Sequence, residues 1–220
     1  MKSFPKKAPA PFPTSVPVSP ERNPSSEKDL QELLRPMHEY ESKIKGAAGN
    51  LLPGTTTLFL LSVKEYSSAP CALLSYFQSK NMPGVYVTIN KPYLDLVKTL
   101  STAPDNVKYV DVITALTGRE TVDLPHVTFL DSPLALVELN LAIAEKLKLI
   151  ASNSKFLIID SVSTLLVYNS TQAVEKFCHT VIAKNRSENL ICLLLMVESE
   201  EYHAVVETLS QFVDKVESIQ

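Results

Sequence analysis

The chain of 220 residues contains no tryptophan, only five glycines and only three cysteines. Without tryptophan, and without a stripe of interleaved basic and aromatic residues, it lacks a surface built to stack nucleic-acid bases. The formal net charge of −3 gives no overall attraction to nucleic acid or to anionic membranes. We therefore expect no nucleic acid among its partners.

Cysteine and histidine are too sparse and too scattered to predict a metal centre. No C-x-x-C motif occurs, and the four histidines have no zinc-ligand spacing. The sequence predicts buried free thiols and a reducing, cytoplasmic setting. The three thiols lie far apart in apolar surroundings, at Cys71, Cys178 and Cys192.

Long apolar runs are also missing, and so are the usual hydrolase signals. The longest runs, such as 190–197, are too short to span a bilayer. The lysines near the N-terminus precede no apolar stretch, so no secretory signal is predicted. No G-x-S-x-G motif follows a strand, which disfavours a Ser–His–Asp hydrolase. The histidines lie mostly within helix or strand patterns, at His38, His126, His179 and His203.

Proline, by contrast, is abundant at the N-terminus, where seven of the fifteen prolines precede residue 25. This spacing predicts a disordered, extended tail over residues 1–25, which we interpret as a linker rather than a polyproline ligand. Residues 26–50 predict a helical segment that begins with a capping box at Ser26 and Asp29, is interrupted by Pro36 and docks on its own domain. Its apolar positions recur at helical spacing, at Leu30, Leu33, Leu34, Met37, Tyr40 and Ile44.

Residues 51–220 predict one α/β domain. Short Val/Ile/Leu-rich strands alternate with helices, and most strands lack the polar alternation of a half-exposed sheet. Repeated β-α-β units predict a three-layer α/β/α sandwich with a mostly parallel central sheet. The predicted strands are 56–61, 85–89, 107–113, 127–130, 156–159, 190–197 and 215–219.

The predicted helices cover 70–80, 92–100, 132–150, 169–187 and 200–212. In the third of them we expect an inward face formed by Leu134, Val137, Leu141, Ala144 and Leu147. In the fourth we expect Val174, Phe177, Val181 and Ile182 to face the sheet, and in the fifth Tyr202, Val205, Val206 and Leu209.

The junction between the first strand and its helix has the length and context of a phosphate-binding loop, G-x-x-x-x-G-K-[ST]. Ser62 and Ser67 stand at the two glycine positions, Ser68 at the lysine and Ala69 at the magnesium-binding hydroxyl. Lys64 lies earlier in the loop, beside Glu65. The stretch therefore has none of the groups that cradle a phosphate, although serine side chains and backbone N–H groups remain.

Acidic residues follow three of the predicted strands, where ligands bind in such folds. Asp160 follows four apolar residues, as the magnesium-binding carboxylate of a Walker B strand does, and Ser161 comes next. Asp131 and Glu198 end two other strands. Either the three carboxylates converge on a cation, or each lies near a helix N-terminus, which is the interpretation we favour.

Four stretches together resemble the RecA/KaiC-like ATPase superfamily, in particular archaeal KaiC-like single-domain proteins. They are 58–62, 83–92, 212–216 and, most specifically, 156–166, which reads FLIIDSVSTLL. The resemblance covers about residues 54–220 and implies a P-loop nucleotidase core. In that family ATP with magnesium occupies the loop, a catalytic glutamate follows the second strand, and hexameric rings are common.

Only Asp160 matches the residues that the family uses. Asn90 stands where the resemblance places the catalytic glutamate, and an amide cannot take a proton from the attacking water. We therefore expect no ATPase activity and no bound cofactor, and a regulatory, signalling or scaffolding role through protein contacts. Expected partners are active KaiC/RecA-like ATPases, signalling proteins or further copies of the chain.

Two alternatives remain open. One is a module that binds ATP, ADP or a small anion without efficient hydrolysis, through Ser62, Lys64, Ser67, Ser68, Ala69, Asp160 and Ser161. The other is an enzyme of unrelated chemistry at the acidic strand ends.

Overall fold

A computed structural model describes residues 39–64, 66–100 and 104–219, which belong to one compact unit, Pro36–Gln220. The proline-rich tail, the capping box at Ser26, Pro36, His38 and Glu65 lie outside the described residues. The described chain forms a seven-stranded sheet in the order β4-β3-β2-β5-β6-β1-β7, and all of its strand pairs are parallel. This confirms the predicted α/β class with a parallel central sheet.

The strands agree with the prediction to within two residues at each end. Their Val/Ile/Leu-rich composition was the decisive signal, because a parallel sheet buries both faces. The strands are β1 (Thr56–Leu61), β2 (Gly84–Thr88), β3 (Val107–Asp111), β4 (Val127–Phe129), β5 (Phe156–Asp160), β6 (Ile191–Val197) and β7 (Lys215–Ile219).

The helices differ more from the prediction. Two elements were not predicted: α5, which begins two residues after Asp160, and a 3-10 turn at Thr114–Thr117. The last predicted helix is divided into a 3-10 turn, Glu200–Tyr202, and α7. The α-helices after β1 are α2 (Ala69–Ser79), α3 (Tyr93–Leu100), α4 (Leu136–Lys148), α5 (Val162–Tyr168), α6 (Thr171–Glu188) and α7 (His203–Ser210).

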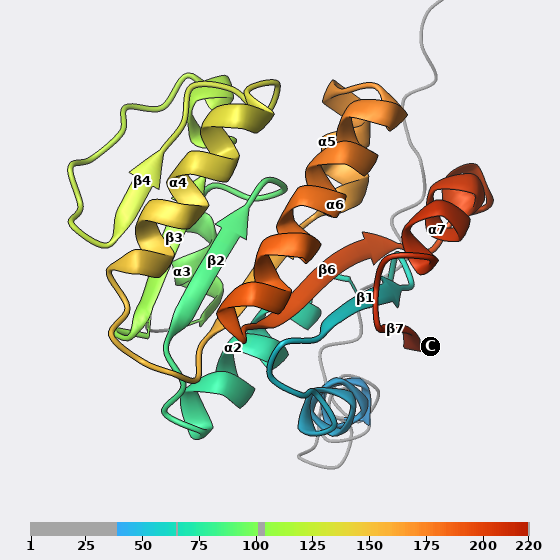
Figure 1. Ribbon diagram of the computed structural model, residues 1–220. Helices are drawn as coiled ribbons and strands as arrows, with labels where there is room; N and C mark the ends of the chain where they lie inside the picture. The colour runs from blue at the N-terminus through green and yellow to red at the C-terminus, as the bar shows by residue number, and fades with distance from the viewer. Residues whose placement is uncertain (1–38, 65, 101–103, 220) are drawn as a thin grey trace, which may run out of the picture. The chain divides into compact units, whose positions relative to one another are not determined.

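Two apolar clusters cover the two faces of the sheet and make the three layers. One cluster joins the sheet to α4, α5, α6 and α7, and the other joins it to α2, α3 and the helical residues 39–49. Figure 1 shows α4 and α6 in front of the sheet and α2 and α3 behind it. Tyr40 and Ile44, predicted to face the domain, are buried in the second cluster.

The inward face predicted for α4 is wrong in its first half. Leu134, Val137 and Leu141 are 62%, 75% and 57% exposed. The face that packs on the sheet is instead formed by Leu139, Ala142, Ile143 and Leu147. Both sets recur at helical spacing, so periodicity alone could not choose between them. The predicted inward faces of α6 and α7 are confirmed, with Phe177 and Leu209 buried.

One glycine permits close packing on the α2 side of the sheet. A β-carbon at Gly84 would lie 2.4 Å from the ring of Phe156 on the neighbouring strand. That ring in turn stacks on Phe77 of α2, with 4.2 Å between centroids. Gly84 thus lets an aromatic layer form directly between β2, β5 and α2.

Candidate functional site: a carboxylate held by two tyrosines

Asp160 is the last residue of β5, a central strand of the sheet. Its side chain lies on the α2 face, because the preceding alternate residues Phe156 and Ile158 belong to the cluster on that face. Only 1% of Asp160 is exposed. An ionised carboxyl group at such a position must be hydrogen-bonded or shift its pKa.

Two tyrosine hydroxyls donate to this carboxyl group. Tyr66, from the loop after β1, donates to Oδ1, and Tyr86, from β2, donates to Oδ2. Tyr86 is paired with Ile158, so its ring reaches diagonally along β5 to a residue two positions further on. Tyr66 must reach across β6, which separates β1 from β5. We call Asp160, Tyr66 and Tyr86 the tyrosine–aspartate cluster.

Burial sets the protonation of this cluster. Desolvation raises the pKa of the Asp160 carboxyl, and the two tyrosine hydrogen bonds and the Lys91 charge only partly offset it. Desolvation, followed by the charge of Asp160, raises the pKa of Tyr66 and that of Tyr86 well above the ordinary value. Both hydroxyls therefore keep their protons and act as donors.

The side chain of Tyr66 fills the loop after β1. Tyr66 is 7% exposed, and its N–H donates to the Ser62 carbonyl at 2.9 Å, which closes a turn. The hydroxyl of Tyr66 contacts the carboxyl group of Asp160 from this turn. The loop thus carries a buried tyrosine that is hydrogen-bonded to the strand-end carboxyl group of Asp160.

The other predicted loop residues differ in burial. Lys64 and Ser67 are exposed, and Ala69 is the buried first residue of α2. Ser62 and Ser68 are half-buried, and the Ser68 carbonyl accepts a helix-type hydrogen bond from Ala72 at 3.0 Å. The structure thus brings Asp160 to the loop through Tyr66, a residue to which the sequence gave no role.

Ser161 and Asn90 flank the cluster on neighbouring strand ends. Ser161 is the N-cap of α5, where its hydroxyl accepts from the Thr164 N–H at 3.1 Å. This cap explains why α5 begins at Val162, directly after Ser161. Asn90 follows β2 and is exposed, next to Ile89, whose N–H donates to the Asp160 carbonyl at 2.6 Å. The predicted glutamate position is therefore beside the cluster.

The acidic strand ends do not form one site, so the cation-binding hypothesis is wrong in its geometry. Asp131 follows β4, three strands from β5, which is roughly 14 Å at the usual strand spacing. Glu198 is exposed and accepts from the Ser218 hydroxyl at 3.3 Å. Within the described part of the chain, no group of three or more His, Cys, Asp or Glu residues could hold a metal ion.

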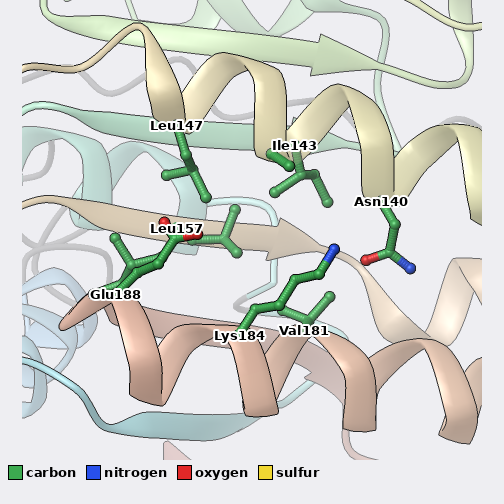
Figure 2. A pocket seen from close by; sticks show the side chains of 9 residues that line it. Asn140, Ile143, Leu147, Leu157, Val181, Lys184 and Glu188 are labelled. Atoms are coloured by element: carbon green, nitrogen blue, oxygen red, sulfur yellow. The ribbon is translucent and has the colours of Figure 1, made fainter.

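An apolar pocket lies elsewhere, between α4 and α6. Figure 2 shows side chains of both helices pointing toward one another over Leu157 of β5. Leu157 belongs to the cluster on the α4 face, whereas Asp160 points to the other face, so the pocket is separate from the tyrosine–aspartate cluster. Its polar lining residues are Asn140, Lys184 and Glu188.

The cysteines and two of the described histidines, His126 and His179, pack against other residues of the fold. All three cysteines are free thiols; Cys178 and Cys192 are buried as predicted, and Cys71 is half-buried. His126 contacts the Tyr93 hydroxyl at 2.7 Å, and His179 packs edge-on against Phe212. These contacts supply no Ser–His–Asp arrangement.

Sequence reasoning missed both tyrosines. Tyr66 occupies a position at which the phosphate-loop motif accepts any residue, and Tyr86 looked like an ordinary strand residue. Period-two alternation along β2 and β5 would have placed Tyr86 and Asp160 on one face only if the two strands had been known to pair.

Fold and site together define an α/β protein of parallel-sheet type whose strand-end carboxylate is covered by side chains. The chain belongs to DUF7504, a family of unknown function, which matches residues 54–217. No curated protein matches the chain. Its fold is similar to that of a KaiC-like protein from the hyperthermophilic archaeon Pyrococcus horikoshii, at a TM-score of 0.47 and 13% sequence identity. That likeness covers 66% of this chain and 62% of the other.

None of the helices in the described part of the chain is both long enough and apolar enough to cross a bilayer.

Proposed function

We propose that this chain is a catalytically inactive domain of RecA/KaiC-like ancestry, a pseudo-ATPase that acts as a regulatory or scaffolding protein. The single observation that carries the proposal is the tyrosine–aspartate cluster. The magnesium-binding carboxylate expected from the sequence is buried and is held by the hydroxyls of Tyr66 and Tyr86. A carboxylate held in this way is not presented to a hydrated cation.

The sequence supports the same conclusion independently. Ser68, Ala69 and Asn90 stand at the positions of the phosphate-binding lysine, the magnesium-binding hydroxyl and the catalytic base. Each loss removes a different part of phosphoryl transfer, namely charge neutralisation, metal placement and activation of water. A role through protein contacts is supported by three large, exposed apolar side chains on and just before α4, at Leu134, Val137 and Leu141.

The test is ATP turnover by the full chain with and without magnesium. We expect phosphate release no faster than in buffer, both in the wild type and in Asp160→Ala. Tyr66→Ala, which removes the side chain that fills the loop, is expected to stay inactive as well, because the lysine, hydroxyl and base are still absent. Magnesium-dependent hydrolysis that is lost in Asp160→Ala would refute the proposal.

The alternative of nucleotide binding without turnover has its own measurement. Calorimetry with ATP and ADP, each with magnesium, is expected to give no heat of binding at millimolar ligand. Heat in the wild type that disappears in Asp160→Ala would favour the binding module. Heat that appears only in Tyr66→Ala would mean that the tyrosine closes a site that can still hold nucleotide.

A further inference from the structure

The strand β7 forms one edge of the sheet and carries an open row of backbone groups. It pairs with β1 on one side, and no strand pairs with its other side in the part of the chain that the structure describes. Figure 1 shows β7 beside β1 at the end of the sheet. An unpaired edge is a ready template for another strand.

The hydrogen bonding to β1 shows which backbone groups point outward. On β1 the Thr55 and Leu61 carbonyls accept from the N–H groups of Cys192 and Glu198 on the β6 side, so the residues between them, such as Leu58, point their backbone groups to β7. Because Leu58 is paired with Val216, it bonds to Lys215 and Glu217, and the backbone N–H and C=O groups of Val216 and Ser218 point to the open edge. The side chain of Val216 lies on the opposite face from those of Lys215 and Glu217 and is 37% exposed.

We propose that β7 pairs antiparallel with β7 of a second copy of this chain, about a two-fold axis at Val216. In this register Lys215 of each copy lies opposite Glu217 of the other, and the two Val216 side chains meet. The outward-pointing backbone groups are then the ones that face each other, as an antiparallel ladder requires.

Charge selects this register among the neighbouring ones. In an antiparallel pair of edge strands, residues whose backbone groups point to the open edge must lie opposite one another. The two-fold axis that relates the two copies must therefore pass through a residue and cannot pass between two residues. An axis at Lys215 would place two lysines opposite each other, and an axis at Glu217 would place two glutamates opposite each other. The axis at Val216 instead continues, between the copies, the ion pair that Lys215 and Glu217 already make within β7.

Charge reversal tests the pairing through the oligomeric state, measured by sedimentation over a concentration series. We expect a concentration-dependent dimer in the wild type. Lys215→Glu and Glu217→Lys, each alone, are expected to weaken it at least about tenfold, because two attractive cross-strand pairs become repulsive. An equimolar mixture of the two variants is expected to dimerise again, because every cross-strand pair is then opposite in sign.

A matched control is Lys176→Glu, an exposed charge reversal on α6 that should leave the dimer unchanged. Circular dichroism checks that each variant is folded. The proposal is overturned if the wild type stays monomeric throughout, if neither reversal weakens the dimer, or if the mixture does not associate.

Cross-linking gives a second test that keeps the wild-type charges. Val216 and its copy form a hydrogen-bonded antiparallel pair in this register, whose α-carbons lie about 5.5 Å apart, a separation that a disulfide can span. Under mild oxidation Val216→Cys is therefore expected to give a disulfide-linked dimer, above the background from the native cysteines. Ser218→Cys is the control, because residue 218 faces residue 214 in this register. Equal cross-linking by both variants, or none by Val216→Cys, contradicts the proposed axis.

Discussion

Tyr66 and Tyr86 bring two hydroxyl groups to one carboxyl group that the surrounding core has removed from water. The arrangement fixes a loop, a strand end and a neighbouring strand to one another. A hydrogen bond to a charged group contributes roughly 1.5–3 kcal/mol, and an unpartnered buried carboxylate would cost more. The cluster therefore stabilises the position of the loop after β1 against the sheet.

The raised pKa of Asp160 predicts a pH-dependent effect of removing its charge. A carboxyl whose folded pKa lies above its unfolded value contributes stability that is full below the unfolded value, about 3.9, and is lost as the pH rises through the folded pKa. We therefore expect the free energy of unfolding of the wild type, relative to Asp160→Asn, to fall as the pH rises from about 4 to about 8.

Urea denaturation across that pH range measures this difference. Asp131→Asn, which changes an exposed carboxyl at another strand end, is the control. The opposite result would be a free energy of unfolding of the wild type that increases, relative to Asp160→Asn, as the pH rises. It would mean that the tyrosine hydrogen bonds and the Lys91 charge outweigh desolvation, and that the folded state favours the ionised carboxylate.

At the scale of the elements, the face of α4 predicted to be buried differs from the face that the structure buries. Its apolar residues occupy nearly all sides, so two faces satisfied the helical period. The strands were predicted closely, because a strand buried on both faces has an unbroken apolar run between turn residues. The 3-10 turn after β3 was missed, since its main determinant is Asp111, which accepts from the N–H groups of Ile113 and Thr114.

Because α4 has one buried and one exposed face, a Leu→Ala substitution should lower the free energy of unfolding by very different amounts on the two faces. Leu139 is fully buried, so Leu139→Ala should lower the free energy of unfolding by about 2–5 kcal/mol through lost burial and a cavity. Leu141→Ala, on the exposed face, should change it by about 0.5 kcal/mol or less. Chemical denaturation of both variants measures the contrast. Similar losses in both would mean that the exposed face of α4 is covered in solution.

At the scale of the whole molecule, one sheet joins two cores. Every central strand contributes side chains to both clusters. Detachment of either helical layer from the sheet would therefore expose apolar side chains of the strands. Such sharing favours a single cooperative unfolding transition. The same sheet leaves β7 as an edge, and that makes the edge available to a second copy.

Cooperativity can be measured with two reporters, because the chain has no tryptophan of its own. Phe129→Trp reports on the α2 face, and Phe212→Trp reports on the α4 face. Both phenylalanines are half-buried, which makes room for the larger ring. In each variant the fluorescence and circular dichroism midpoints in urea are expected to coincide. A fluorescence transition that precedes the dichroism transition in either variant would show that one layer unfolds separately.

The sequence by itself determined the parallel α/β class, the seven strands, and the position of Asp160 at the end of a buried strand. Those features are local, since they follow from apolar runs, turn residues and motif spacing. Only the tertiary structure decided that Tyr66 and Tyr86 meet at Asp160, that Asp131 and Glu198 lie apart, and which face of α4 is buried. Those outcomes depend on strand order and helix rotation, which residues distant in sequence fix together when they pack.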